Sequence, residues 1–215
     1  MRRFRFTIKA RVVVAVVALL VVSLGGVVGY ITTRSLAEAK AAGYAYAGEV
    51  AQRNAESIEQ VLRGAVDTAR AFTPMLLASS STGGDRRVVN AELRSVLATH
   101  PDLLGTWTCW QPNAFDGRDR DFRSAGAGDD ATGRLVPYWV RDGGAITQTP
   151  LVDYDKPGAN DWYAIAASTR QEKIIEPYVY KIGGQDVLMT SVAEPMVRDG
   201  KVVGVSGVDL TLASL

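Results

Sequence analysis

The sequence of 215 residues contains one cysteine, Cys109, and one histidine, His100. A single cysteine cannot form a disulfide within the chain, and a single histidine cannot by itself build a metal site. Because Cys109 lies in an apolar run, we interpret it as a buried structural thiol. No metal and no other cofactor is expected.

The sequence also lacks the elements of a hydrolase. It has no Gly-x-Ser-x-Gly segment, in which a strained turn presents a nucleophilic serine. The one histidine follows a predicted helix, and Ser191 has no general base near it in the sequence. The sequence therefore predicts a protein that is not an enzyme.

A strong net charge is absent as well, since the formal value is +1. Positive charge is concentrated in residues 1–11, which contain no acidic residue but contain Arg2, Arg3, Arg5, Lys9 and Arg11. The rest of the chain is therefore acidic overall. This argues against nucleic acid as a partner.

One stretch has no charge at all. Val12 to Thr33 contains no charged residue, and a helix needs about 20 apolar residues to span a bilayer. A secretory signal peptide is the alternative, but its apolar region is usually only about 7–15 residues long. We predict a retained, single-pass transmembrane helix over residues 12–33. The basic residues before it place residues 1–11 in the cytoplasm and the chain after Arg34 outside the cytoplasmic (inner) membrane, in the periplasm or extracellular space.

Residues 34–80 are predicted to form a long extracytoplasmic helix that continues from the transmembrane segment. Apolar residues recur at steps of three and four from Val50 to Leu76. Such a stripe pairs with a second copy of the helix or covers a sheet. Different parts of the helix could serve these two purposes. Pro74 should bend or end the helix near its last turn.

Residues 81–215 predict one helix followed by an antiparallel sheet. Asp85 is a suitable N-cap for the helix. Strands are expected at residues 103–110, 136–141, 145–149, 173–182, 186–197 and 201–211. Tight turns with glycine are expected at residues 143–144, 183–184 and 199–200. The predicted fold class is α+β.

Aromatic residues gather between and within these strands. A turn-rich loop leads into Trp162 and Tyr163 at the start of a short helix, and a strand then brings Tyr178 and Tyr180. Because these two tyrosines are two positions apart, they lie on one face of the strand. This arrangement suits a pocket for a small molecule.

The order of these motifs resembles the extracytoplasmic double Cache sensor of methyl-accepting chemotaxis proteins, the bacterial chemoreceptors. The features that carry it are the anchor, the long helix, Trp162-Tyr163, Pro177-Tyr178 and the final strand with Gly207-Val208-Asp209. The resemblance covers nearly the whole chain. It implies a PAS-like sheet flanked by helices, a ligand pocket in a membrane-distal module at residues 81–215, and a homodimer formed through the long helix.

Chemoreceptors of this family also carry a membrane-proximal module, a second membrane span and cytoplasmic signalling domains. None of these is present here, so the resemblance implies an N-terminal fragment. Cytoplasmic signalling partners are expected only if an output domain exists in the full-length gene.

Amino-acid receptors of this family share a ligand signature that the chain matches only in part. The matching residues are Trp162, Tyr163, Tyr178 and Asp209. Asn160 stands where the family has an arginine, and Tyr180 where it has an aspartate. An arginine grips a carboxylate with two charged hydrogen bonds, each worth about 1.5–3 kcal/mol, and asparagine cannot do so. Either Arg134 or Arg141 replaces it, or the ligand carries no carboxylate there.

The predicted site is aromatic and acidic, with Asp161 nearby. Its candidate residues are Trp110, Tyr138, Trp139, Tyr154, Asp155, Trp162, Tyr163, Tyr178, Tyr180 and Asp209. An ammonium over an aromatic face gains about 0.5–2 kcal/mol, and Asp209 would supply the opposite charge. The alternatives are core packing for some of these aromatic residues and a purely structural hydrogen-bonding role for Asp209.

We therefore predict a sensor for a small organic cation, such as a biogenic or quaternary amine. The alternatives are an amino-acid sensor, or the sensor region of a histidine kinase or of a cyclic-dinucleotide enzyme.

Overall fold

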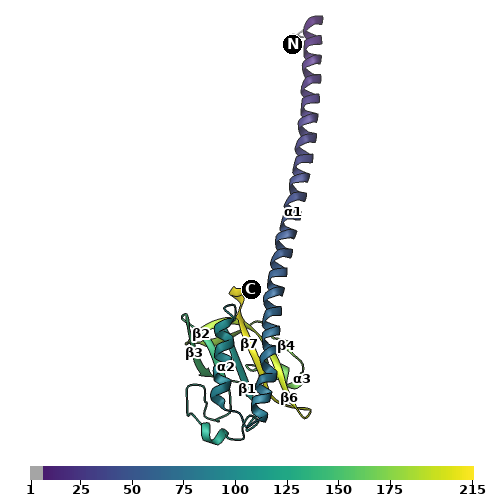
Figure 1. The fold of residues 1–215 in the computed structure, drawn as a ribbon. Coiled ribbons are helices and arrows are strands. Elements are labelled where there is room, and N and C mark those ends of the chain that lie inside the picture. The colour runs from purple at the N-terminus through teal and green to yellow at the C-terminus, as the bar shows by residue number, and fades with distance from the viewer. Residues whose placement is uncertain (1–6) are drawn as a thin grey trace. The chain divides into compact units, whose positions relative to one another are not determined.

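The computed structural model describes residues 7–215, and the chain divides into two units, residues 1–56 and residues 57–215. Helix α1 (Ile8–Ser81) is unbroken and belongs in part to each unit (Figure 1). The predicted continuity of the apolar stretch with the long helix is thus confirmed. Pro74 does not end the helix, which continues to Ser81.

The first unit holds the apolar part of α1. Helix α1 is the one helix in residues 7–215 that is long and apolar enough to cross a membrane, with a mean hydropathy of 2.8 in its most apolar window. Its large apolar side chains are exposed, as Leu19 and Val22 illustrate at 70% and 73%. Three of the five N-terminal basic residues precede the described part of the chain. The membrane span and its orientation remain predictions.

The second unit contains a seven-stranded antiparallel sheet. Its strands are β1 (Gly105–Trp110), β2 (Pro137–Asp142), β3 (Ala145–Pro150), β4 (Lys173–Ile174), β5 (Tyr178–Ile182), β6 (Gln185–Arg198) and β7 (Lys201–Thr211). They lie in the order β3-β2-β1-β7-β6-β4, and β5 also pairs with β6. Together with the helices, this confirms the α+β fold class.

The prediction of one continuous strand at residues 173–182 is wrong. It is divided into β4 and β5, which pair separately with β6 through Lys173 and Tyr178. Pro177 lies between them and has no backbone N–H to donate to a neighbouring strand. The predicted turns are confirmed, because Gly183 and Gly184 have positive φ angles of 57° and 82°, as a tight hairpin turn requires.

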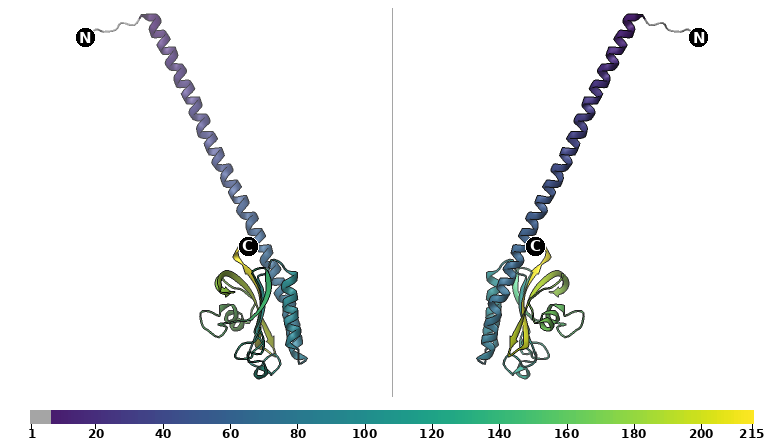
Figure 2. Two further views of the ribbon diagram at one scale, coloured as in Figure 1. Left: turned by 90° about the vertical axis from the view of Figure 1, so that its left-hand side faces the viewer. Right: turned by 90° about the vertical axis from the view of Figure 1, so that its right-hand side faces the viewer.

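Helices cover one face of the sheet, and a short helix with long loops covers the other (Figure 2). On the first face, Phe72 and Leu76 of α1 pack with Leu93 of α2 (Arg86–Thr99) against strand residues. Asp85 caps α2 as predicted, since its side chain accepts a hydrogen bond from the Arg87 N–H at 2.8 Å. On the second face lies α3 (Asp161–Thr169). Short 3-10 helices occur at η1 (Asp119–Phe122) and η2 (Leu212–Ser214).

Candidate functional site

A buried carboxylate lies at the centre of the sheet face that α3 covers. Asp209 on β7 is 1% exposed. One of its oxygens accepts hydrogen bonds from Trp107 Nε1 at 2.8 Å and from Ser191 Oγ at 2.6 Å. The Tyr178 hydroxyl extends this chain, since it lies 2.7 Å from Ser191 Oγ. Burial raises the pKa of Asp209 to about 6, although these hydrogen bonds act in the opposite direction.

No lysine or arginine of residues 7–215 forms an ion pair with Asp209. The Tyr138 hydroxyl is buried close to this carboxylate but does not meet the distance and angle of a well-formed hydrogen bond. Burial also raises the pKa of Tyr138 well above its usual value, so this hydroxyl keeps its proton. The centre of the site therefore has a carboxylate with a protonated tyrosine hydroxyl close to it.

Two glycines give the aromatic rings room beside Asp209. A Cβ atom on Gly105 would lie 2.5 Å from Cε2 of Tyr138, and one on Gly207 would lie 2.3 Å from Cζ2 of Trp107. Both distances are shorter than any ordinary van der Waals contact. The two rings thus lie directly on the backbone of β1 and of β7, the strand that carries the carboxylate.

Five aromatic side chains form what we call the aromatic cluster: Trp107, Tyr138, Trp162, Tyr178 and Tyr180. The Trp107 and Trp162 rings meet edge to face with centroids 5.1 Å apart. Tyr180 is 5.8 Å from Tyr138, 6.5 Å from Trp162 and 6.4 Å from Tyr178. These are the favoured separations of interacting aromatic rings.

An open cleft of about 490 Å³, called here the aromatic cleft, lies outside this cluster. Trp162, Tyr178 and Tyr180 line it. The charged residues that line it are Asp153, Asp161, Asp186 and Lys181. Lys181 is paired with Asp186 at 2.7 Å, so the cleft is acidic overall. Asp209 does not line the open cleft, but Ser191 links it by hydrogen bonds to Tyr178, which does.

The prediction that Trp110 and Trp139 belong to this site is wrong. Side chains alternate between the faces of a strand, and both residues point to the face covered by α1 and α2. Trp110 packs on Phe115 with ring centroids 5.1 Å apart. Trp139 Nε1 donates a hydrogen bond to Asn90 on α2 at 3.0 Å. Trp110 is fully buried in the core between the sheet and these helices, and Trp139 is partly buried against that core.

Tyr154, Tyr163 and Asp155 lie on the correct side of the sheet but do not line the aromatic cleft. The Tyr154 hydroxyl donates a hydrogen bond to Asp130, and the Tyr163 hydroxyl accepts one from Gln111. Tyr154 and Asp155 line a second cleft. Tyr163 touches the aromatic cluster through Trp162, with centroids 6.2 Å apart.

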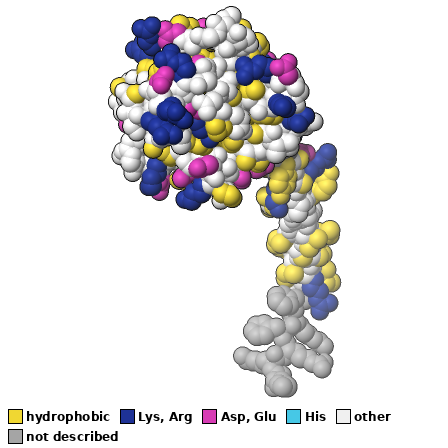
Figure 3. Space-filling view, turned by 90° about the horizontal axis from the view of Figure 1, so that it is seen from below, with side chains coloured by type: hydrophobic (Ala, Val, Ile, Leu, Met, Phe, Trp, Pro, Cys, Tyr) yellow, Lys and Arg dark blue, Asp and Glu magenta, His cyan; other side chains and the backbone are white. Residues whose placement is uncertain are grey.

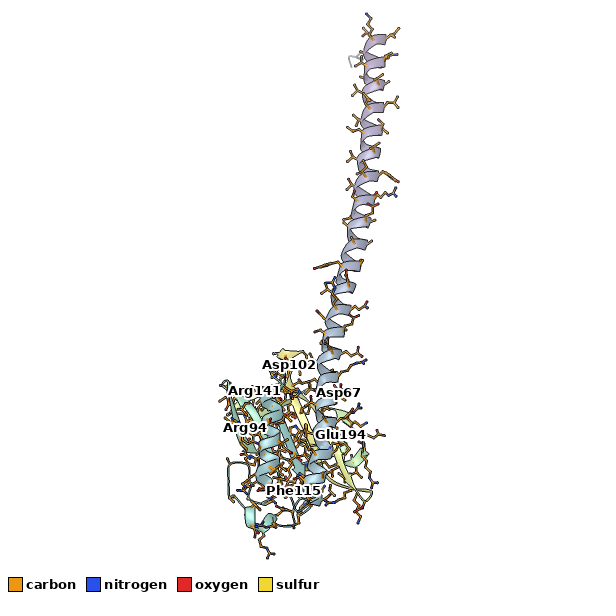
Figure 4. All side chains as sticks on the ribbon, viewed as in Figure 1. Asp67, Arg94, Asp102, Phe115, Arg141 and Glu194 are labelled. Carbon is orange, nitrogen blue, oxygen red and sulfur yellow. The ribbon has the colours of Figure 1, made fainter. Side chains whose placement is uncertain are left out.

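Neither arginine considered as a carboxylate ligand lines the aromatic cleft. Arg141 donates hydrogen bonds to the carbonyls of Leu103 and Leu97, at 3.0 and 2.5 Å, at the end of α2 (Figure 4). Arg134 lines the second cleft instead. Asn160 uses its side-chain amide to bond the Tyr154 carbonyl at 3.0 Å.

Two residues that sequence reasoning missed are Trp107 and Ser191, the hydrogen-bond donors to Asp209. The alternation of β1 could have identified Trp107, because it shares the face of Cys109, and Trp110 does not. Cys109 is completely buried, as predicted, and its burial raises the thiol pKa to about 12.

Comparisons with known proteins agree on a sensor module. Residues 89–215 match the family described as methyl-accepting chemotaxis protein-like, first PDC sensor domain. The chain is 34% identical over 141 residues to methyl-accepting chemotaxis protein TlpQ of Pseudomonas aeruginosa. That match covers 60% of this chain but only 20% of the relative, so the chain spans a small part of that receptor's length.

Solved structures show the same fold. Methyl-accepting Chemotaxis protein X shares 30% identity with a TM-score of 0.66, over 76% of this chain and 60% of that one. The extracellular domain of mmHK1S-Z3, a protein classed as a histidine kinase, shares 30% identity with a TM-score of 0.57, over 74% of this chain and 60% of that one.

These findings confirm the resemblance to chemoreceptor sensors and the prediction that the chain is a ligand-binding module rather than an enzyme. The chain belongs to the family of methyl-accepting chemotaxis protein-like first PDC sensor domains.

Proposed function

We propose that this sensor module recognises a small organic cation, a biogenic or quaternary amine, and that Asp209 is the counter-ion of its positive charge. The observation that carries the proposal is a carboxylate that is 1% exposed and has no cationic partner among residues 7–215. An unpaired buried charge is costly, and proteins normally pair it or neutralise it. An ammonium group would supply the missing charge.

The aromatic cluster suits the same ligand. Cations are attracted to the faces of aromatic rings, and quaternary ammonium groups bind in cages of several such rings. Three rings of the cluster, those of Trp162, Tyr178 and Tyr180, already line the acidic aromatic cleft. Its carboxylates would attract a cation and repel an anion before either reaches the rings.

Asp209 is 1% exposed and does not line the aromatic cleft, so a ligand in the cleft reaches it only if a side chain of the aromatic cluster moves. Tyr180 is held by one hydrogen bond at its hydroxyl, which the Val152 N–H donates at 3.1 Å. Its side chain is half-buried. We infer that rotation of Tyr180 opens the path and that its ring then closes on the bound cation.

A carboxylate ligand is disfavoured by the same geometry. Asn160 replaces the arginine of the amino-acid signature, and neither Arg134 nor Arg141 lines the aromatic cleft. The free amino group of an amino acid could still bind Asp209. Its carboxylate would then meet an acidic cleft.

Calorimetric titration of the full chain in detergent micelles with choline, tyramine and alanine tests the proposal. We expect binding of an amine and none of alanine. Asp209→Asn should weaken amine binding more than tenfold, while Asp199→Asn, an exposed change at the turn between β6 and β7, should leave it unchanged. Binding of alanine without binding of either amine would identify an amino-acid sensor instead.

The downstream output of the sensor is a separate matter, because the family match covers a sensor module and relatives include both a chemotaxis protein and a histidine kinase. We propose that the full-length protein is a chemoreceptor of the methyl-accepting class. Sequencing the full-length gene tests this, since a kinase or cyclic-dinucleotide domain after the sensor would contradict it.

A further inference from the structure

We propose that a second cleft in this unit, lined by arginines, binds a small oxyanion of the carboxylate or phosphate class. The cleft has a volume of about 680 Å³ and lies between the loop that carries η1 and the loop at Tyr154. It does not share a lining residue with the aromatic cleft. The proposal is independent of the amine site.

The central observation is the position of Arg134, which is 9% exposed. Its Nε donates a hydrogen bond to the Trp110 carbonyl at 2.7 Å, and its guanidinium carbon lies 4.5 Å from the centre of the Tyr154 ring. One terminal nitrogen has only a weak contact with Cys109 Sγ at 3.8 Å. The guanidinium is thus held in place, yet it pairs with no carboxylate in residues 7–215.

Arg86, the other buried arginine beside this loop, provides an internal comparison. It is 5% exposed and is fully paired, with Asp116 at 2.8 Å and Asp119 at 2.9 Å. It also donates a hydrogen bond to the Gly133 carbonyl at 2.7 Å. This arginine, which begins α2, is therefore paired with carboxylates of the loop. Arg134 is not, although burying an unpaired charge is costly.

The other charges of the cleft leave a positive excess. Asp119 is engaged by Arg86, and Asp121 pairs with Arg118 at 3.0 Å. Arg120 and Arg123 are exposed at the rim and form no ion pair in the described part of the chain. Among the lining residues, Asp155 is then the one carboxylate without an arginine partner, and Arg120, Arg123 and Arg134 are three guanidinium groups that form no ion pair in residues 7–215.

Figure 3 views the end of the unit where this loop lies, with lysine and arginine side chains spread over the surface. A fixed, partly stacked guanidinium with free N–H groups matches a planar carboxylate or a phosphate, which accept paired hydrogen bonds. Two flexible arginines at the rim would complete the contacts. We infer that Arg134 forms the floor of the site and Arg120 and Arg123 its rim.

Titration of the full chain with inorganic phosphate and, separately, with malonate tests the inference. We expect saturable binding of at least one anion, and the stronger one assigns the site to phosphates or to carboxylates. Because Arg134→Gln could disturb folding, the main variant is Arg120→Gln/Arg123→Gln, in which both residues are exposed. We expect it to bind the anion at least tenfold more weakly.

The matched control is Arg170→Gln/Lys201→Gln, which removes two exposed positive charges elsewhere in the same unit. It should bind the anion as the unchanged chain does. Equal weakening in both double variants, or no saturable binding of either anion, would overturn the inference. Amine titration of the Arg120→Gln/Arg123→Gln variant should be unaffected, which separates this site from the aromatic cleft.

Discussion

The ionised form of Asp209, which the proposed cation needs, is the form that makes the folded chain less stable. Its pKa of about 6 in the folded chain, against 3.8 for an ordinary aspartate, means that the folded state holds its proton more tightly than the unfolded state. The free energy of unfolding is therefore highest when this group is protonated. It falls as the pH rises from about 4 to about 6 and then stays level.

Replacing this carboxylate should stabilise the empty protein. A difference of about two pKa units corresponds to about 3 kcal/mol. Asp209→Asn should thus raise the free energy of unfolding by up to about 3 kcal/mol at pH 8 and have little effect at pH 4. Thermal unfolding at both pH values checks this. A loss of stability at pH 8 would mean that the ionised carboxylate has a structural role that asparagine cannot fill.

The same titration should control ligand affinity. A cation binds the ionised form of Asp209, so protons compete with it below the pKa of about 6. We expect the dissociation constant of an amine to be constant above pH 7 and to increase about tenfold per pH unit below pH 6. Calorimetry across this range measures it. A flat profile would place the cation elsewhere in the cleft.

At the scale of elements, local chemistry was sufficient for some features and not for others. The cap at Asp85 and the turn at Gly183-Gly184 depend on residues adjacent in sequence, and both were predictable. The division of β4 from β5 coincides with Pro177, a local signal that the single strand predicted at residues 173–182 did not take into account. The face on which Trp110 lies depends on the register of β1 against its neighbours. One position of shift would exchange Trp110 with Cys109 and reverse the answer.

Helix α2 should depend measurably on its cap. The Asp85 side chain satisfies the Arg87 N–H, which has no partner within the helix. Asp85→Ala should lower the free energy of unfolding by about 1 kcal/mol. Chemical denaturation followed by circular dichroism measures the change. Asp102→Ala, an exposed change beyond the other end of α2, is the control and should have little effect.

At the scale of the whole molecule, the apolar part of α1 carries the largest untested prediction. Its exposed valines and leucines are unfavourable in water, and a bilayer would remove that cost. Only composition and length indicate the span, and the orientation follows from basic residues at the N-terminus. We therefore place the sensor unit outside the inner membrane as a proposal, together with pairing of two copies through α1.

Reporter fusions would establish the orientation. Alkaline phosphatase is active only outside the cytoplasm, so a fusion after Gly84 should be active and a fusion after Arg11 inactive. An inactive fusion after Gly84 would place the sensor unit in the cytoplasm. Cross-linking of single cysteines introduced at Val50 in a Cys109→Ser chain would test the pairing of helices.

The lone buried thiol of Cys109 has a practical consequence. With a pKa of about 12 and no exposed surface, it reacts with alkylating reagents only when the sheet opens. The rate of alkylation of the unchanged chain therefore measures how often the core opens. No second cysteine contributes to this rate. A ligand that binds the folded protein should lower the rate of alkylation in proportion to the fraction of binding sites that it occupies. Candidate compounds could thus be ranked without introducing a label, by the time each one delays modification of a single sulfur atom.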